Sequence, residues 1–193
     1  MFSSSTYLLA LLFVLGSALA DQGCPRIPGI QIYETTPNEG LSGGRFTSCD
    51  NGFDSPKVRA GNASSYDWWY FDAIGTDGVS SLAVVYFVEA SKSGFTVTEN
   101  FTNQDFVQIS GTFPNGTTFS DFLFAENAIV SAMGDGSSGL WNGTGASWAG
   151  SPDLSNYLIT LDGSHLGYEG TFSMHSVSGL PARGFTTQFE IER

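Results

Sequence analysis

From residue 66 onward, the pattern of hydrophobic and polar positions is that of short β-strands. Phe95 and Val97 alternate with Thr96 and Thr98, which places apolar and polar side chains on opposite faces of an extended chain. Similar runs are rich in Phe, Tyr, Val, Ile and Thr, and most are bounded by Gly, Asn or Asp. The predicted strands are Tyr66–Ile74, Ser80–Glu89, Phe95–Phe101, Asp105–Thr112, Thr117–Phe124, Ala128–Met133, Leu140–Trp148, Tyr157–Leu161, His165–Met174 and Phe185–Ile191.

The segments between these runs contain the residues that tight turns need. Gly75–Gly78, Pro114–Gly116 and Asp162–Gly163 offer Gly, Asn or Asp, which tolerate positive φ. No segment keeps a helical period of 3.6 residues between capping residues. The pattern therefore predicts an all-β protein, folded as an antiparallel β-barrel or β-sandwich.

The first 20 residues have the layout of a secretory signal peptide. The apolar run Tyr7–Leu19 ends in the small-x-small sequence Ala18-Leu19-Ala20, directly before Asp21. The run is shorter than the roughly 20 apolar residues that cross a bilayer, and no later stretch could do so. We therefore expect a secreted protein that has no membrane association once the signal is cleaved, with an uncleaved anchor as the alternative.

Other features of the sequence fit the secretory pathway. The two cysteines, Cys24 and Cys49, are expected to form a disulfide, with two unpaired thiols as the alternative. Four N-x-[ST] sequons predict N-glycosylation. They begin at Asn62, Asn100, Asn115 and Asn142.

Composition divides the rest of the chain into two parts. Residues 21–63 are rich in Pro, Gly, Ser and Asn and are expected to form a loosely ordered leader, whereas residues 64–193 form the β domain. The net charge is −12, and all 7 basic residues follow the signal without forming a basic patch. Because an acidic surface repels phosphate backbones, nucleic acid is excluded as an expected partner.

The segment Ser65–Ala73, with the sequence SYDWWYFDA, is the most distinctive part of the chain. A strand with four consecutive aromatic residues is expected to be covered on both faces. A carboxyl group flanked by aromatic rings in a dry cavity would have a raised pKa, which suits a general acid or a hydrogen-bond donor to a ligand carbonyl. By alternation, one face carries Asp67, Trp69 and Phe71, and the other carries Trp68, Tyr70 and Asp72.

This segment resembles the (E/D)-W-W-Y-F-D-A signature of the carotenoid 1,2-hydratase (hydroxyneurosporene synthase)-like superfamily. The fungal branch of that superfamily includes lipocalin-like Diels–Alderases. The following strand, Ser80–Phe87, is also similar, so the specific resemblance covers about twenty-five residues. It implies a lipocalin-like fold of two β-barrel-like domains with an apolar pocket, of which this chain would be the N-terminal half.

The resemblance also implies roles for individual residues. The acid before the tryptophan pair falls on Asp67, which would act as the catalytic acid without any cofactor. Trp69 and Phe71 would form the wall of the pocket, and Trp68 and Tyr70 would also bind the apolar substrate. Tyr86, on the next strand, would either line the pocket or fill the core. The family more often has Glu at the position of Asp67, and the shorter side chain reaches less far.

We therefore expect a cofactor-free cyclase or isomerase, similar to a Diels–Alderase, that acts on an apolar polyketide-type secondary metabolite. The alternatives are a non-catalytic, lipocalin-like binder of an apolar small molecule and an enzyme of acid-assisted hydration. The oligomeric state is not predicted.

Other chemistry has less support in the sequence. His165 and His175 match no metal motif, so no metal site is expected. Glu89 and Glu99 would suit a glycosidase only if they faced each other across a hairpin. The sequence contains no P-loop, dinucleotide-binding or nucleophile-elbow motif. The glycine-rich segment Gly134–Gly139 is expected to be a mobile loop.

Overall fold

The computed structural model describes residues 29–44, 54–59, 61–89, 101–132, 136–163, 167–176 and 185–192. For Glu89, Tyr168 and residues 185–192 it describes the backbone alone. Several predictions therefore lie outside the described residues. These are the signal peptide, the Cys24–Cys49 disulfide, the sequon at Asn100, the strand Phe95–Phe101, and the side chains of Glu89, Glu99 and His165.

All the described strands pair antiparallel, in three sheets. Within the described chain, no helix is long and apolar enough to cross a membrane. The larger sheet has seven strands in the order β1 (Gly29–Glu34), β8 (Asn127–Ala132), β9 (Ser137–Asn142), β10 (Ala146–Gly150), β11 (Asn156–Gly163), β12 (Tyr168–Ser176) and β13 (Phe185–Glu192). The smaller sheet has four, in the order β4 (Tyr66–Ile74), β5 (Ser81–Glu89), β6 (Asp105–Thr112) and β7 (Thr118–Phe124). The short strands β2 (Gly43–Gly44) and β3 (Val58–Arg59) pair with each other.

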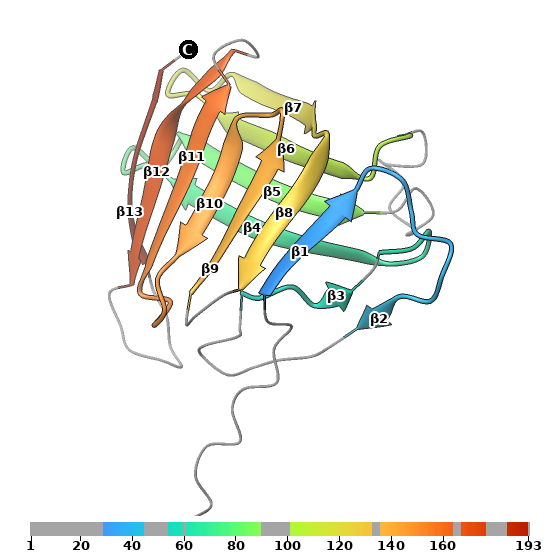
Figure 1. Ribbon diagram of the computed structural model, residues 1–193. Coiled ribbons are helices and arrows are strands. Elements are labelled where there is room, and N and C mark those ends of the chain that lie inside the picture. Colours follow the sequence, from blue (N-terminus) through green and yellow to red (C-terminus); the bar gives the residue numbers. More distant parts are fainter. Residues whose placement is uncertain are drawn as a thin grey trace, which may run out of the picture.

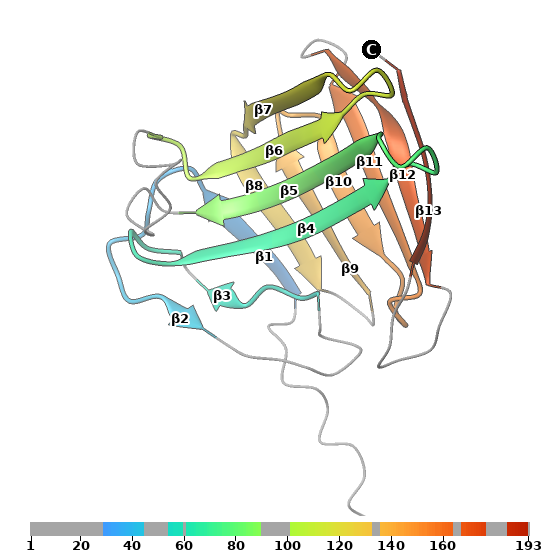
Figure 2. The ribbon, with the colours of Figure 1, turned by 180° about the vertical axis from the view of Figure 1, so that it is seen from behind.

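The two large sheets pack face to face, and their strands cross steeply (Figure 1). The view from behind shows β4 to β7 as a separate layer over the larger sheet (Figure 2). No hydrogen-bonded ladder joins the two layers among the described strands. The fold is thus an antiparallel β-sandwich, which confirms the predicted all-β class.

One predicted strand, Leu140–Trp148, is wrong, because the chain reverses in its middle. Gly143 and Gly145 adopt φ values of 83° and 73°, which L-residues rarely adopt, and they end β9 and begin β10. Between them, the Thr144 hydroxyl donates to the Trp141 carbonyl at 2.6 Å. The predicted loop Gly134–Gly139 is also shorter than expected, because its last three residues belong to β9.

The segment 21–63, predicted as a loosely ordered leader, contributes an integral strand of the larger sheet. Strand β1 pairs with β8 along its whole length, from Gly29 opposite Ala132 to Glu34 opposite Asn127. The side chain of Tyr33, on this strand, is buried in the core. The alternation of Ile30 and Ile32 with their neighbours is typical of a strand, but the surrounding Pro and Gly residues led to the prediction of a leader.

Aromatic side chains fill the space between the sheets and hydrogen-bond across it. Tyr86 on β5 donates its hydroxyl to the Ser147 carbonyl of β10 at 2.8 Å. In the opposite direction, Trp141 on β9 donates its indole N–H to the Phe87 carbonyl of β5 at 2.8 Å. Because buried aromatic side chains with polar groups need such partners, these bonds fix how the two layers face each other.

Gly139 provides a test of this packing, because a Cβ there would lie 2.3 Å from Nε1 of Trp148 and 2.8 Å from Cζ3 of Trp141. We expect Gly139→Ala to lower the free energy of unfolding by about 1–3 kcal/mol, as overpacking of a core does. Gly43→Ala is the matched control, because a Cβ there would meet nothing within 4 Å. Urea denaturation measures both variants, and equal stabilities would contradict the packing of the two indoles against Gly139.

Candidate functional site

Strand β4 carries the distinctive sequence, and its side chains alternate between the inside and the outside of the sandwich as predicted. Trp69 and Phe71 are buried, and Asp67 shares their inward side of the strand. Trp68 and Tyr70 point outward and are 43% and 55% exposed. The expectation that both faces of this strand are covered is therefore wrong for this structure, and the two outward residues do not line the interior.

The inward residues of β4 belong to a tight cluster of rings. The Trp69 ring lies 5.7 Å from that of Trp141 and 5.8 Å from that of Trp148, measured between centroids. Tyr86 packs against Trp141 at 4.9 Å. Because the rings contact one another directly, Tyr86 fills the core rather than an open wall.

Asp54, whose carboxyl group is buried, makes hydrogen bonds at one end of this cluster. The Trp69 indole N–H donates to the Asp54 carbonyl at 2.7 Å, and the Ser137 hydroxyl donates to Oδ1 of Asp54 at 2.8 Å. The Tyr157 hydroxyl donates to Oδ2 at 3.4 Å. Burial raises the pKa of Asp54, and the bond from Ser137 and the Lys57 ammonium are among the interactions that oppose the rise.

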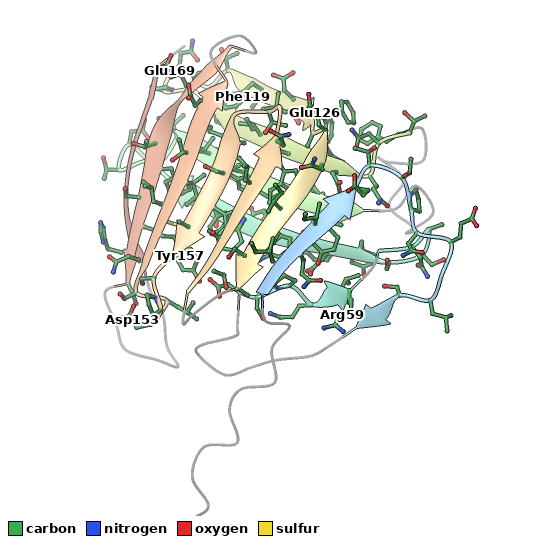
Figure 3. The ribbon with its side chains drawn as sticks, viewed as in Figure 1. Arg59, Phe119, Glu126, Asp153, Tyr157 and Glu169 are labelled. Atoms are coloured by element: carbon green, nitrogen blue, oxygen red, sulfur yellow. The ribbon has the colours of Figure 1, made fainter. Side chains whose placement is uncertain are left out.

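Tyr157, one of the partners of Asp54, lies at the same end of the larger sheet as Asp153 and far from Glu126 (Figure 3).

The carboxylate of Asp67 accepts hydrogen bonds from the segment that precedes β4. Its Oδ2 accepts the backbone N–H of Lys57 at 2.7 Å and that of Val58 at 3.3 Å, while Oδ1 accepts the N–H of Trp68 at 3.0 Å. Burial raises the pKa of Asp67, whereas these bonds and the charge of Lys57 lower it. The predicted acid is therefore largely enclosed, but its oxygens are already occupied by N–H donors.

Asp105, the first residue of β6, is a second inward-facing acid that the sequence analysis did not single out. Register pairs Val88 with both Asp67 and Asp105, so the three form one cross-strand row, which we call the acid row. Neighbouring strands are about 4.8 Å apart, so the two acidic residues lie about 10 Å from each other. Alternation along the strand could have identified it, because residues 105, 107 and 109 lie on the same face and the side chains of Val107 and Ile109 are buried.

The carboxyl group of Asp105 is buried at 0% exposure, and neither oxygen has a hydrogen-bond partner among the described residues. Burial raises its pKa to about 8, and the Glu34 carboxylate adds to the rise. The backbone of Ala128 opposes it, without making a hydrogen bond of normal geometry. Asp105 is therefore largely protonated at neutral pH, which makes it a hydrogen-bond donor.

Tyr33 on β1 faces the acid row from the opposite sheet. Its hydroxyl donates to the Val58 carbonyl at 2.5 Å. Burial raises the pKa of Tyr33, and the nearby charges of Asp67 and Asp105 raise it further. One end of the interior thus combines two carboxyl groups and a neutral phenol, directly beside the row that holds Trp69 and Tyr86.

The outward residues of β4 belong to a different surface, the outer aromatic face of the smaller sheet. Register places Trp68, Phe87, Phe106 and Phe124 side by side across all four strands. Tyr66 stacks on Trp68 with a centroid separation of 5.2 Å. Any binding by Trp68 and Tyr70 would therefore take place on this face and not between the sheets.

The raised pKa of Asp105 predicts how stability depends on pH. The folded pKa is about 8 against an ordinary value of 3.8, so the folded state holds this proton more tightly than the unfolded state. The stabilising effect is complete below about pH 4 and is lost as the pH rises towards about 8, at about 1.4 kcal/mol per unit of pKa difference. We expect the stability of the wild type to fall over this range relative to that of Asp105→Asn. Urea denaturation from about pH 4 to about pH 9 measures this, and a difference independent of pH would contradict it.

Comparison with known proteins places this sandwich in a family. The family model described as Diels-Alderase-like matches residues 25–185. The quinolone epoxide rearrangement protein asqO of Emericella nidulans is 30% identical over 172 residues, which cover 88% of this chain and 47% of the relative. The quinolone epoxide rearrangement protein penF of Penicillium thymicola is 35% identical over 131 residues, which cover 65% of this chain and 36% of the relative.

Solved structures agree on the fold. The crystal structure of CghA matches with a TM-score of 0.62 at 21% identity, over 82% of this chain and 42% of that one. The present chain thus spans half or less of the length of the relatives it matches. Since the family model covers most of the sequence, the chain belongs to the Diels-Alderase-like family.

Proposed function

We propose that this chain provides an acid-bearing and aromatic part of a cofactor-free cyclase or isomerase that acts on an apolar secondary metabolite. The observation that carries the proposal is the inner face of the smaller sheet, where the acid row lies directly beside the aromatic row of Trp69 and Tyr86. The named activities of the relatives, quinolone epoxide rearrangement and Diels–Alder cyclisation, support the same class of reaction.

An epoxide rearrangement, and a Diels–Alder reaction whose diene and dienophile belong to the same substrate, reorganise bonds within one molecule, so an enzyme can promote them by orientation and by hydrogen bonding. A neutral carboxyl group can donate a hydrogen bond to an epoxide oxygen, which weakens the C–O bond, or to a carbonyl that activates a neighbouring π-system. Tryptophan faces stabilise positive charge that develops on a carbon atom. The wider kinship with carotenoid 1,2-hydratases is part of the proposal and makes acid-assisted hydration the alternative reaction.

In this proposal, Asp67 donates to the substrate oxygen, and Trp69 and Phe71 form the apolar wall. A raised pKa supports the role of Asp67, because burial favours its neutral form. A quinolone epoxide is the first substrate to test, since two relatives are named for its rearrangement.

We expect the chain to convert a quinolone epoxide and Asp67→Asn to lower the rate by about 10²–10⁴, the usual effect of losing a general acid. Asp67→Asn also removes acceptors for backbone N–H groups, so we expect a loss of about 1–3 kcal/mol in stability. Asp72→Asn, on the exposed face of the same strand, is the matched control and should change neither quantity. Chromatography of the products and urea denaturation measure the two effects.

The same assay separates an enzyme from a binder. If the wild-type protein quenches its tryptophan fluorescence on adding the quinolone epoxide but releases it unchanged, the chain is a non-catalytic binding protein. Turnover that is equal in the wild type and in Asp67→Asn would remove Asp67 from the mechanism.

We also propose that the protein is secreted and glycosylated. Asn115 supports this, because it is exposed at the turn between β6 and β7, where its Oδ1 accepts the Thr117 N–H at 2.9 Å. Asn62 and Asn142 are half-buried, and their amide groups donate to Gly40 and Glu126. Asn115 is therefore the described sequon best placed to carry a glycan.

Secretion by a fungal host should yield a protein that begins near Asp21 and that loses mass on treatment with a glycosidase. Asn115→Gln should remove part of this mass difference without changing secretion, because the side chain lies at an exposed turn. Mass spectrometry measures both the N-terminus and the glycan. Intact Met1 together with no glycosidase-sensitive mass would contradict the proposal.

A further inference from the structure

The fold buries the carboxyl group of Asp105 beside the backbone of Ala128 but gives it no hydrogen bond of normal geometry within the described residues. The residue is 0% exposed, and both of its carboxyl oxygens lack a hydrogen-bond partner in the described part of the chain. Its side chain points between the sheets, in the same phase as the core residues Val107 and Ile109. A buried carboxyl group without a partner costs stability, and such groups are rare in native proteins.

The backbone on both sides of Asp105 is held by hydrogen bonds. Its own N–H donates to Oδ1 of Asn103 at 2.8 Å, and its carbonyl accepts the N–H of Ala125 at 2.9 Å. The Asn103 amide donates to the Ala125 carbonyl at 2.6 Å, and the Gln104 amide donates to the Glu34 carbonyl at 2.5 Å. These hydrogen bonds fix the segment leading into β6, and the carboxyl group that this segment places in the interior has unused hydrogen-bonding capacity, as has Oδ1 of Asn127 on β8.

Burial keeps this carboxyl group neutral, and the charge of Glu34 adds to the effect. Tyr33 and Glu34 approach from β1, and Asp67 lies in the same row on β4. None of the three is a cation, and Glu34 disfavours a second negative charge. Lys57 interacts with Asp67 and Asp54 on the far side of the row. A neutral carboxyl group keeps one O–H to donate. The oxygens of Asp67 also accept three N–H groups, so Asp105 is the acid of the row with more unused hydrogen-bonding capacity.

We propose that Asp105 is a ligand-binding acid, whose O–H donates a hydrogen bond to a carbonyl or epoxide oxygen of the substrate at the acid row. This inference rests on the proposed function and deepens it. The proton stays on Asp105, so no bond to it breaks. The ligand would place its oxygen-bearing end at the acid row.

The first test is spectroscopic and requires no turnover. Infrared spectra of the full chain carrying ¹³C-labelled aspartate should show, at neutral pH, a C=O band of neutral carboxylic acid that is weaker in Asp105→Asn than in the wild type, because Asp105 contributes to it. Asp72→Asn is the control and should retain the band. Adding 2-quinolone, a carbonyl-bearing probe, should shift the band to lower frequency, because a hydrogen-bonded acid has a weaker C=O bond. A band that is absent from the wild type, or that saturating 2-quinolone leaves unmoved, overturns the inference.

Turnover then separates this inference from the proposed function. We expect Asp105→Leu, whose side chain cannot donate a hydrogen bond, to lower conversion of the quinolone epoxide by about 10²-fold or more while retaining a folded near-ultraviolet spectrum. Asp105→Asn keeps an N–H donor at this position and should lose less activity. An active wild type with an equally active Asp105→Leu overturns the role of Asp105 and leaves the proposed function intact. If Asp105→Leu does not fold, the smaller Asp105→Ala replaces it. An inactive wild type that shows the shifted band contradicts the proposed function but supports the hydrogen bond.

Discussion

The burial of the Trp69 indole between the two sheets is the interaction on which much of this structure depends. Its ring contacts Trp141 and Trp148 of the larger sheet, and its N–H reaches the carbonyl of Asp54, before β4. One side chain therefore joins three parts of the chain that are distant in sequence. Removing a buried tryptophan of this kind costs about 3–5 kcal/mol, which is a large share of the stability of a single domain.

The interior combines this apolar packing with an unusual amount of buried acid. Asp54 and Asp67 are stabilised by hydrogen bonds from Ser137 and from backbone N–H groups, whereas Asp105 has none among the described residues. Replacing a buried, poorly compensated polar group by an apolar one of similar size is often neutral or stabilising. A fold that retains poorly compensated acids beside its largest rings gives up stability where a function can use them.

Local patterns in the sequence predicted the hairpin strands well and the long-range contacts poorly. Strand β4 and strand β6 have the predicted bounds, because aromatic and β-branched residues fill each strand and turn-forming residues flank it. The reversal at Gly143 and Gly145 was missed, since apolar runs on either side read as one continuous strand. Strand β1 was taken for part of a leader, because its partner lies almost a hundred residues away.

The candidate site shows the same division. Alternation assigned Trp69 and Phe71 to the interior and grouped Asp67 with them, as the structure has it. Asp54 could not be found, because only the packing of distant strands brings it to Ser137 and Tyr157. Alternation along β6 was enough to place Asp105 on the inward face. That its carboxyl group lacks a hydrogen-bond partner depends on contacts with other strands, which no sequence pattern specifies.

The pairing of β1 with β8 has a consequence for how the chain is made. Strand β1 leaves the ribosome early, yet its partner, Asn127–Ala132, follows only after the whole four-stranded sheet. The hairpins β4 to β7 can form from neighbouring segments as they appear, whereas β1 must wait with its backbone unpaired. During synthesis, the first strand therefore stays unpaired until the eighth strand arrives, and the interior closes only after β9 and β10 have added Trp141 and Trp148.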